Sequence, residues 1–228
     1  MGSTRLPGKV MRPLGDTTVL GQVLRRCAAI PGIDVVVCAT GTDPADEPIV
    51  AEAPRHGAVV SRGSPSDVLA RYHGAAQQVG ADIVMRVTSD CPLIDPEVCG
   101  AVLALRREAA ADYAANNMPP SFPHGLDCEA FTASALARAA GIATDPHDRE
   151  HVTPWLRRTE GLVRANLAGP GGTLIHNRWT LDYPEDFDFF TAVFASLPGA
   201  ATAGWRTVLE LVAARPDIAA LNAGRHQR

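Results

Sequence analysis

The stretch ADIVMRVTSDCPLIDPEV, residues 81–98, contains the unit from which the fold is built. Its first half is rich in β-branched and large apolar residues, which is typical of a buried strand in a parallel sheet. Asp90 follows directly after this strand, and Pro92 then turns the chain. Asp95-Pro96 has the pattern of a helix N-cap followed by proline at the first helical position. The stretch therefore predicts a strand, a turn that carries a carboxylate, and a helix.

The same alternation extends toward the N-terminus. DVVVCAT (34–40) and GAVVSRG (57–63) are β-branched runs bounded by turn residues, and each is flanked by segments with apolar residues at helical spacing. Alternating strands and helices are typical of a three-layer α/β/α fold of Rossmann-like type with a mostly parallel central sheet. Ligands of such sheets bind at the carboxyl ends of the strands, so we expect the loops after residues 40, 60 and 88 to share one crevice.

The second half of the chain is less regular. A helix is expected to begin near Thr132, and GGTLIHNRWTLDYPEDF (171–187) predicts a strand that ends in a turn, followed by a helix from about Pro184. No repeat or linker divides the 228 residues, so we expect one domain over 1–228. Within it we expect a nucleotide-binding half, 1–110, and an acceptor-binding half, 111–228.

Composition excludes several classes of protein. The net charge of −4 argues against a nucleic-acid-binding protein, which usually carries a clustered basic excess. No apolar run approaches the length of a membrane-spanning helix, so we expect no membrane partner. The five cysteines are odd in number and include no C-x-x-C pair, which favours free thiols and a cytoplasmic location.

The opening loop, MGSTRLPGKV (1–10), has the composition of a phosphate-binding loop. Small residues expose backbone N–H groups, an arginine offers a planar fork, and a lysine offers a point charge. Pro-Gly at positions 7–8 favours a turn. The residues that would contact phosphate are Gly2, Ser3, Thr4, Arg5 and Lys9. An exposed basic terminus is the simpler alternative.

Two acids stand at predicted strand ends, Asp90 and, in TLDYPEDF (180–187), Asp182. Carboxylates in such positions suit Mg²⁺, a hard cation that binds one or two carboxylates together with phosphate oxygens. Helix capping is the alternative for Asp90, and it is the preferred interpretation for Asp95. Glu185 and Asp186 are expected to stabilise the first turn of the helix that follows them.

The sequence HDREH (147–151) matches the zinc-peptidase pattern H-x-x-E-H. Pro146 and Pro154 leave only about two turns of helix around it, and no acidic helix follows to supply a third ligand. We therefore expect no zinc site here. Arg149, Glu150 and His151 are interpreted as a polar cluster that faces a hydroxylated substrate, or else as a hydrogen-bond network.

Taken together, these stretches resemble the cytidylyltransferase family of CMP-sugar synthetases, and within it the spore coat polysaccharide (SpsF-like) branch. The matching segments occur in the family's order and cover nearly the whole chain. They are GSTRLPGKVMRPLG, VVVCATGTDPADEPIV, VVSRGSPSDVLARY, MRVTSDCPLIDPEV, DYAANN, HGLDCEAF, REHVTPW and TLDYPEDF.

This resemblance implies a nucleotidyltransferase of GT-A-like fold that transfers CMP from CTP to a sugar or sugar-acid hydroxyl and releases pyrophosphate. Asp90 and Asp182 would hold Mg²⁺, while Arg5 and Lys9 would neutralise phosphate charge. The nucleotide would also be contacted by Thr40, Arg62, Thr88 and Ser89. The acceptor would be lined by Asn116, Asp127, Glu129, Arg149, Glu150, His151 and Arg178. A homodimer is possible.

One departure from the family concerns the start of the chain. Relatives carry a short apolar strand ahead of the G-S-T-R-L-P-G-K loop, and this sequence lacks that strand of roughly 5–6 residues. We expect the natural chain to begin upstream of Met1, although a chain that evolved without the strand is the rival interpretation. Two further alternatives stay open: a different nucleotide or a non-sugar acceptor such as a phosphonate, and a catalytically silent nucleotide-binding subunit.

Overall fold

The strands of the protein form two pairs and one sheet of four within residues 2–225, the part of the chain that this computed structural model describes. Strands β1 (Pro13–Leu14) and β2 (Thr17–Thr18) form a short antiparallel hairpin. Strand β3 (Val37–Gly41) runs parallel to β4 (Val59–Gly63). The larger sheet has the order β5-β7-β6-β8. Its strands are β5 (Ile83–Arg86), β6 (Tyr113–Ala115), β7 (Glu129–Thr132) and β8 (Arg164–Asn166).

The predicted α/β class is confirmed, and the sheet proves to be mixed. β7 runs antiparallel to β5 and β6, whereas β6 and β8 are parallel. The prediction of a strand in residues 171–182 is wrong. Gly171 and Gly172 have φ values of 68° and 62°, which a strand does not contain, and a 3-10 helix, η4 (Gly172–His176), follows. Within residues 2–225, the segment 171–182 forms a single isolated β-bridge, between Arg178 and His124.

The helices begin where the sequence provides caps. Asp95 Oδ1 accepts a hydrogen bond of 3.0 Å from the Val98 N–H, which confirms its capping role. No helix among the described residues is both long enough and apolar enough to span a membrane. The α-helices are α1 (Val19–Ala28), α2 (Glu47–Glu52), α3 (Val68–Gln78), α4 (Pro96–Glu108), α5 (Ala133–Ile142), α6 (Pro146–His151), α7 (Pro154–Arg158), α8 (Pro184–Ser196), α9 (Trp205–Ala214) and α10 (Pro216–Ala220). The remaining 3-10 helices are η1 (Lys9–Met11), η2 (Pro44–Asp46), η3 (Ala53–His56) and η5 (Ala223–Arg225).

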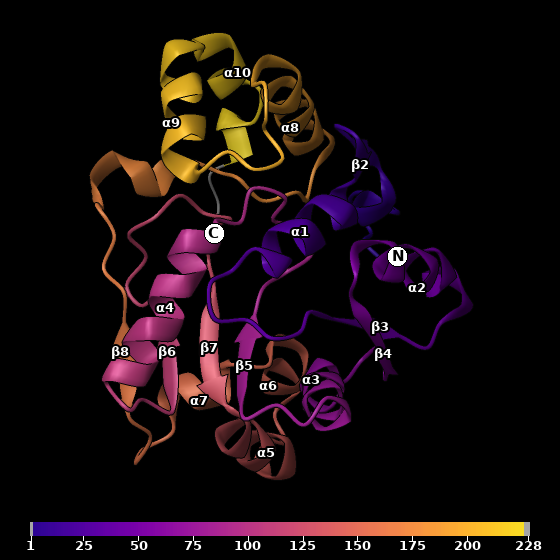
Figure 1. Ribbon diagram of the computed structural model, residues 1–228, viewed down its shortest axis with the longest axis vertical. Helices are drawn as coiled ribbons and strands as arrows, with labels where there is room; N and C mark the ends of the chain where they lie inside the picture. Colours follow the sequence, from indigo (N-terminus) through magenta and orange to yellow (C-terminus); the bar gives the residue numbers. More distant parts are fainter. Residues whose placement is uncertain (1, 226–228) are drawn as a thin grey trace.

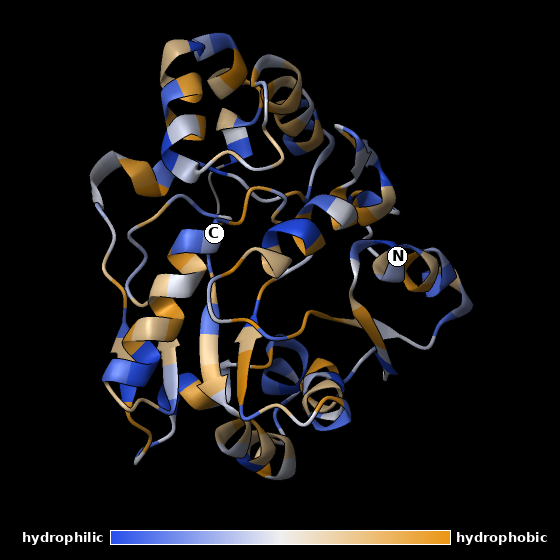
Figure 2. Ribbon diagram, viewed as in Figure 1, coloured by the Kyte–Doolittle hydropathy of each residue, from blue (hydrophilic) through white to orange (hydrophobic). Residues whose placement is uncertain are grey.

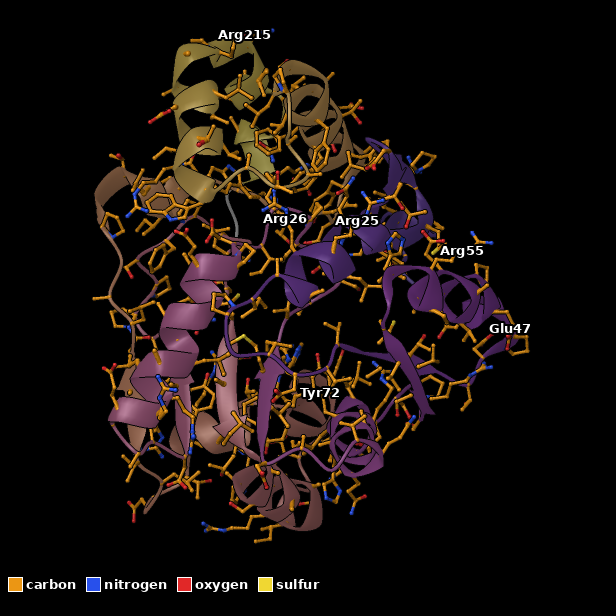
Figure 3. The ribbon with its side chains drawn as sticks, viewed as in Figure 1. Arg25, Arg26, Glu47, Arg55, Tyr72 and Arg215 are labelled. Atoms are coloured by element: carbon orange, nitrogen blue, oxygen red, sulfur yellow. The ribbon has the colours of Figure 1, made fainter. Side chains whose placement is uncertain are left out.

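The four-stranded sheet is covered on both faces, which gives three layers (Figure 1). Ala114 of β6 packs with α4, whereas its neighbour Tyr113 packs with α3, α5 and α7 on the opposite face, as the two-residue period of a strand requires. Figure 2 shows β5 and β7 in hydrophobic colours between these layers. Helices α8, α9 and α10 form a separate cap whose core includes Trp179 and Leu181. Arg26 joins α1 to this cap by donating to the carbonyl oxygens of Ala200 and Ala203 (Figure 3).

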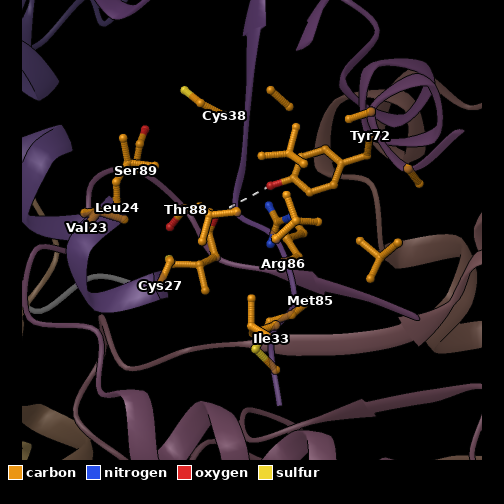
Figure 4. A pocket seen from close by; sticks show the side chains of 18 of the residues that line it. Val23, Leu24, Cys27, Ile33, Cys38, Tyr72, Met85, Arg86, Thr88 and Ser89 are labelled. Carbon is orange, nitrogen blue, oxygen red and sulfur yellow. Dashed lines mark hydrogen bonds between the residues drawn. The ribbon is translucent and has the colours of Figure 1, made fainter. Parts of the chain in front are cut away.

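A cavity of about 1260 Å³ lies between β3 and β5 (Figure 4). Its walls include the unbroken runs 30–41 and 79–89, so it follows one edge of each strand. Among the described residues β3 pairs only with β4, and β5 only with β7. Helix α1 lines one side and helix α3 lines another. Tyr72 reaches from α3 toward β5 (Figure 3), and its hydroxyl group donates to the Val87 carbonyl oxygen over 3.4 Å.

We call this cavity the slot, because it runs between the facing edges of β3 and β5. It exceeds the range of roughly 300–1,000 Å³ that is usual for ligand pockets. Every residue of β5 is only half-buried, although strands covered by helices on both faces are usually fully buried. That a further strand belongs in this slot stays a prediction.

Candidate active site

Three segments that are distant in sequence meet beyond the carboxyl end of β5. They are the opening loop with η1, the turn after β5, and the segment that leads into α8. The Leu181 N–H donates to the Asp90 carbonyl oxygen over 2.8 Å, which brings the two acidic segments together. Asp90 and Asp182 therefore lie side by side, as expected for residues that share a metal.

The ammonium group of Lys9 lies between these two acids. Its Nζ is 2.9 Å from Asp90 Oδ2, 3.0 Å from Asp182 Oδ1 and 2.6 Å from the Leu181 carbonyl oxygen. Lys9 is the only lysine among the 21 Lys and Arg residues of the chain. A lysine carries a compact charge with three donors, which matches three converging oxygens better than the planar fork of an arginine does.

Two arginines also contact Asp182, one at the oxygen that Lys9 contacts and one at the other oxygen. Arg5 Nη2 is 3.3 Å from Asp182 Oδ1, and Arg178 Nη2 is 2.9 Å from Asp182 Oδ2. Arg178 also donates from Nε to Asp186 Oδ1 over 2.9 Å, and it is only 6% exposed. Arg178, predicted to line the acceptor pocket, thus lies beneath Asp182 and supports it.

The acid Asp186 completes this support from the first turn of α8. Its Oδ2 accepts hydrogen bonds from the backbone N–H groups of Asp182 and Tyr183, at 2.9 and 3.0 Å. This confirms the predicted role at the helix start. The sequence places three charged residues at intervals of four, namely Arg178, Asp182 and Asp186. This spacing was the signal that could have predicted their contacts.

Electrostatics keep the cluster charged. Burial disfavours the Lys9 ammonium group, but Asp90 and Asp182 outweigh burial and raise the pKa of Lys9 above its usual value. Burial likewise disfavours the carboxylate of Asp182. Hydrogen bonds and charge from Lys9, Arg178 and Arg5 outweigh it, so the pKa of Asp182 lies below its usual value. Lys9 and Asp182 are therefore both ionised at neutral pH.

The oxygens around Lys9 also fit a divalent cation. Two carboxylates and a carbonyl oxygen are the hard donors that Mg²⁺ prefers. Residues 2–225 contain no group of three or more His, Cys, Asp and Glu side chains that could hold a metal. A cation at Asp90 and Asp182 would thus complete its coordination with water and phosphate oxygens, as Mg²⁺ does at nucleotide sites.

Most of the predicted nucleotide contacts line one cavity. Gly2, Ser3, Lys9, Thr40, Thr88 and Ser89 all line the slot between β3 and β5. Pro65 of the loop after β4 lines it too, which confirms that the loops after residues 40, 60 and 88 share one crevice. Thr4 is exposed. Arg62 fastens the loop after β3, since its Nε donates to the Gly41 carbonyl oxygen over 3.1 Å.

Asn116 and Asp127, both predicted to line the acceptor pocket, differ in accessibility. Asn116 is buried, because its amide group donates to the Leu126 carbonyl oxygen and accepts from the Cys128 N–H. Asn116 therefore braces the backbone on both sides of Asp127, whose side chain stays partly exposed. The sequence needs glycine at position 125, because a Cβ atom there would lie 2.1 Å from the Trp179 carbonyl oxygen.

Glu129 does not line an accessible pocket. It is 1% exposed and forms ion pairs with Arg86 of β5 and Arg157 of α7, and the Tyr113 hydroxyl group donates to it. Sequence reasoning missed these partners. The signal was Arg86 itself, since a charge inside an apolar strand requires a buried partner.

The HDREH segment forms helix α6, which packs against α3. Arg149 pairs with Asp67, the N-cap of α3, and donates to the Ala140 carbonyl oxygen. Glu150 and His151 are exposed. The ring centroids of His147 and His151 lie 4.4 Å apart. Within residues 2–225, no third His, Cys, Asp or Glu side chain joins them to form a group that could hold a metal. No described contact joins these residues to the Lys9 cluster, so their role toward an acceptor stays a prediction.

Comparisons with known proteins agree with this geometry. The model of the cytidylyltransferase family matches residues 1–188. The spore coat polysaccharide biosynthesis protein SpsF of Bacillus subtilis is 29% identical over 226 residues, which cover 96% of this chain and 93% of SpsF. The 3-deoxy-manno-octulosonate cytidylyltransferase of Leptothrix cholodnii is 35% identical over 207 residues, 87% of this chain and 70% of that enzyme. A solved cytidylyltransferase of Leptospira borgpetersenii superposes with a TM-score of 0.89 at 31% identity, covering 96% of this chain and 92% of that one.

Proposed function

The chain belongs to the cytidylyltransferase family, whose members transfer CMP from CTP, and we propose that this enzyme transfers it to a hydroxyl group of a sugar or sugar acid. Pyrophosphate leaves, and the metal at Asp90 and Asp182 is Mg²⁺. The acceptor class is supported by the similarity to SpsF, a polysaccharide biosynthesis protein, and to 3-deoxy-manno-octulosonate cytidylyltransferase. The five free thiols favour the cytoplasm as its location.

One observation carries the proposal: Lys9, which lines the cavity beside the ends of β3 and β5, meets Asp90 and Asp182, and Arg5 joins them at Asp182. A triphosphate needs a metal that both acids can hold and cations that face its oxygens. A nucleotide-binding subunit without catalysis would not need to keep both carboxylates. The pair of acids therefore favours an enzyme over a silent nucleotide-binding subunit.

The chemistry is a displacement at the α-phosphorus of CTP. The acceptor hydroxyl oxygen forms the new bond to phosphorus, the bond to the bridging oxygen of pyrophosphate breaks, and the hydroxyl proton passes to solvent. Lys9 and Arg5 neutralise charge on the phosphates and the leaving pyrophosphate. Arg178 and Asp186 hold Asp182 in place. Mg²⁺ at the two acids would supply Lewis-acid neutralisation of phosphate oxygens.

The test is pyrophosphate release from each of the four nucleoside triphosphates with Mg²⁺ and a panel of acceptors. The panel contains neutral sugars, sugar acids and a phosphonate. We expect release with CTP and one sugar-class acceptor, and a CMP adduct of matching mass. Turnover of another nucleotide, or with the phosphonate alone, would replace the proposed substrate class. Tight CTP binding without release for any acceptor would favour the silent subunit.

A further inference from the structure

The three donors of the Lys9 ammonium group are all satisfied within the metal site. Asp90 Oδ2, Asp182 Oδ1 and the Leu181 carbonyl oxygen lie 2.6 to 3.0 Å from Nζ, and the Lys9 side chain is only 14% exposed. These are the oxygens that a divalent cation would need. A cation that bridges the two carboxylates therefore competes with Lys9 for them.

The surroundings of Asp182 decide which cation can leave. Arg178 is 5% exposed at its side chain and is bound to Asp186 by two hydrogen bonds, so it cannot move away without leaving a buried acid unpaired. Arg5 is 55% exposed and shares Asp182 Oδ1 with Lys9, but it has no described contact with Asp90 and so does not lie between the two acids. Lys9 lies between the two acids on a flexible side chain, and it lines the cavity where the phosphates would lie. Lys9 is the cation that must move.

The charge balance shows when it moves. Asp90, Asp182 and Asp186 are matched by Lys9, Arg5 and Arg178, so the cluster carries three charges of each sign. A divalent cation on its own would leave two positive charges in excess. The phosphates of CTP on their own would draw Lys9 away and leave two carboxylates facing one another. With metal and nucleotide together, the cation takes the two carboxylates and Lys9 takes phosphate oxygens, so neither the acids nor the ammonium group is left without a partner.

We propose that Lys9 is an internal counter-ion of the metal site, which holds Asp90 and Asp182 together until CTP and the divalent cation arrive jointly, and which then moves to the phosphates. The inference rests on the proposed function only in taking CTP and a divalent cation as the ligands. It makes metal and nucleotide binding strongly cooperative, since each ligand removes the unfavourable consequence of binding the other.

Because Lys9 is the only lysine, one isotope-labelled residue reports on it directly. We would prepare the protein with ¹³C-lysine and follow its single set of side-chain methylene NMR signals without any acceptor. We expect the Lys9 signals to keep their positions with Mg²⁺ alone and with CTP in EDTA, and to shift when both are present. A full shift with either ligand alone, or no shift with both, would overturn the proposal.

A pair of variants separates occupancy from net charge. Lys9→Met empties the position between the acids, whereas Arg5→Met removes an equal charge beside Asp182 without opening that position. With Mn²⁺ as the probe and no nucleotide, we expect Lys9→Met to bind Mn²⁺ about tenfold more tightly than the wild type. Arg5→Met should change the Mn²⁺ affinity by much less. Equal gains in the two variants would show that charge alone matters and would overturn the proposal.

Both readouts are independent of turnover. If Lys9→Met fails to fold, which circular dichroism would show, the NMR titration of the wild-type protein still decides the question. If the enzyme turns over CTP but its Lys9 signals shift with Mg²⁺ alone, the proposed function stands and this inference is overturned. If no CTP is turned over but the Lys9 signals shift only when Mg²⁺ and CTP are both present, this inference stands and the proposed function is overturned.

Discussion

Two ionic clusters of this protein use the same kinds of side chain for different ends. Around Asp90 and Asp182, the two carboxylates keep 24% and 22% of their side-chain surface exposed, and Lys9 lies between them. Around Glu129, the carboxylate is 2% exposed at its side chain, and Arg86 and Arg157 enclose it. The first cluster can exchange one of its cations for a ligand. In the second, the carboxylate is enclosed by its partners, although Arg86 itself lines the cavity between β3 and β5.

This difference teaches that burial, more than residue type, separates a reactive site from a structural one. Glu129 ties β7 to β5 and α7 by charged hydrogen bonds, so that removing it would break the fold rather than the chemistry. The Lys9 cluster instead keeps its two carboxylates partly exposed, and Lys9 lines the cavity. The predictions below test this division, beginning with the largest expected effect.

Replacement of Asp90 should remove activity and leave the fold intact. We expect Asp90→Asn to lower the rate of CTP turnover by a factor of about 10²–10³ or more, because misplaced metal leaves the phosphate charge unneutralised. The measurement is pyrophosphate release, with thermal melts as the check on folding. Asp188→Asn, at an exposed acid of α8, is the matched control and should keep its activity. Near-normal turnover of a folded Asp90→Asn would refute the assignment.

Replacement of Glu129 should lower the stability of the fold rather than act on the catalytic chemistry. Glu129→Gln leaves Arg86 and Arg157 without a buried counter-charge, and we expect a loss of about 3–5 kcal/mol in the free energy of unfolding. Urea titration measures it. The control, Glu108→Gln at the exposed end of α4, should stay within about 0.5 kcal/mol of the wild type. A fully stable Glu129→Gln that lost only acceptor affinity would restore Glu129 to the acceptor pocket.

The stability that Glu129 contributes should depend on pH. Burial disfavours its charged form, but Arg86 and Arg157 outweigh burial and lower the pKa of Glu129. A carboxylate with a lowered pKa stabilises the fold fully above its unfolded pKa of about 4.3, and this stabilisation is lost as the pH falls through the folded value. We therefore expect the difference in unfolding free energy between wild type and Glu129→Gln to narrow below about pH 4. A difference that stays constant from pH 7 to pH 3 would contradict this.

A strand supplied to the slot should stabilise both clusters, because Lys9 and Arg86 each line the cavity between β3 and β5. We expect a chain extended ahead of Gly2 by an apolar segment of strand length to have a melting temperature at least about 2–4 °C higher. In a chain of this size, that shift corresponds to about 1 kcal/mol in the free energy of unfolding. CTP titration should show tighter binding as well. An extension of the same length made of glycine and serine is the control. Equal melting temperatures and affinities for both extensions would show that no strand enters the slot.

The smallest effect is expected from zinc. We expect purified protein to contain no stoichiometric zinc, and a zinc chelator to leave the dissociation constant of CTP unchanged. Metal analysis and CTP titration check the two statements. About one tightly bound zinc ion per chain would instead assign a metal to His147 and His151.

Sequence reasoning predicted the helix and strand positions of the first half well, because the signals there are local. The cap at Asp95 and the strand before Asp90 each depend on residues a few positions apart. The same holds for the cap at Asp186 in the second half. That Lys9, Asp90 and Asp182 act on one metal and its phosphates was implied only by the resemblance to the family, since the expected strand before Asp182 is absent. Sequence reasoning failed for residues 171–182, where two glycines of positive φ prevent the predicted strand.

What the sequence by itself determined is the set of local elements and the chemical types that each one carries. Only the tertiary structure decided which charged groups meet. Arg86 and Glu129 are 43 positions apart, and Lys9 and Asp182 are 173 apart. Residues at such separations leave no mark in a local pattern, since each pair forms only when the packing of the sheet excludes water and requires every buried charge to find a partner. The same packing placed Arg178 beneath the site and enclosed Glu129, and thereby separated the groups that can bind a ligand from those that hold the fold.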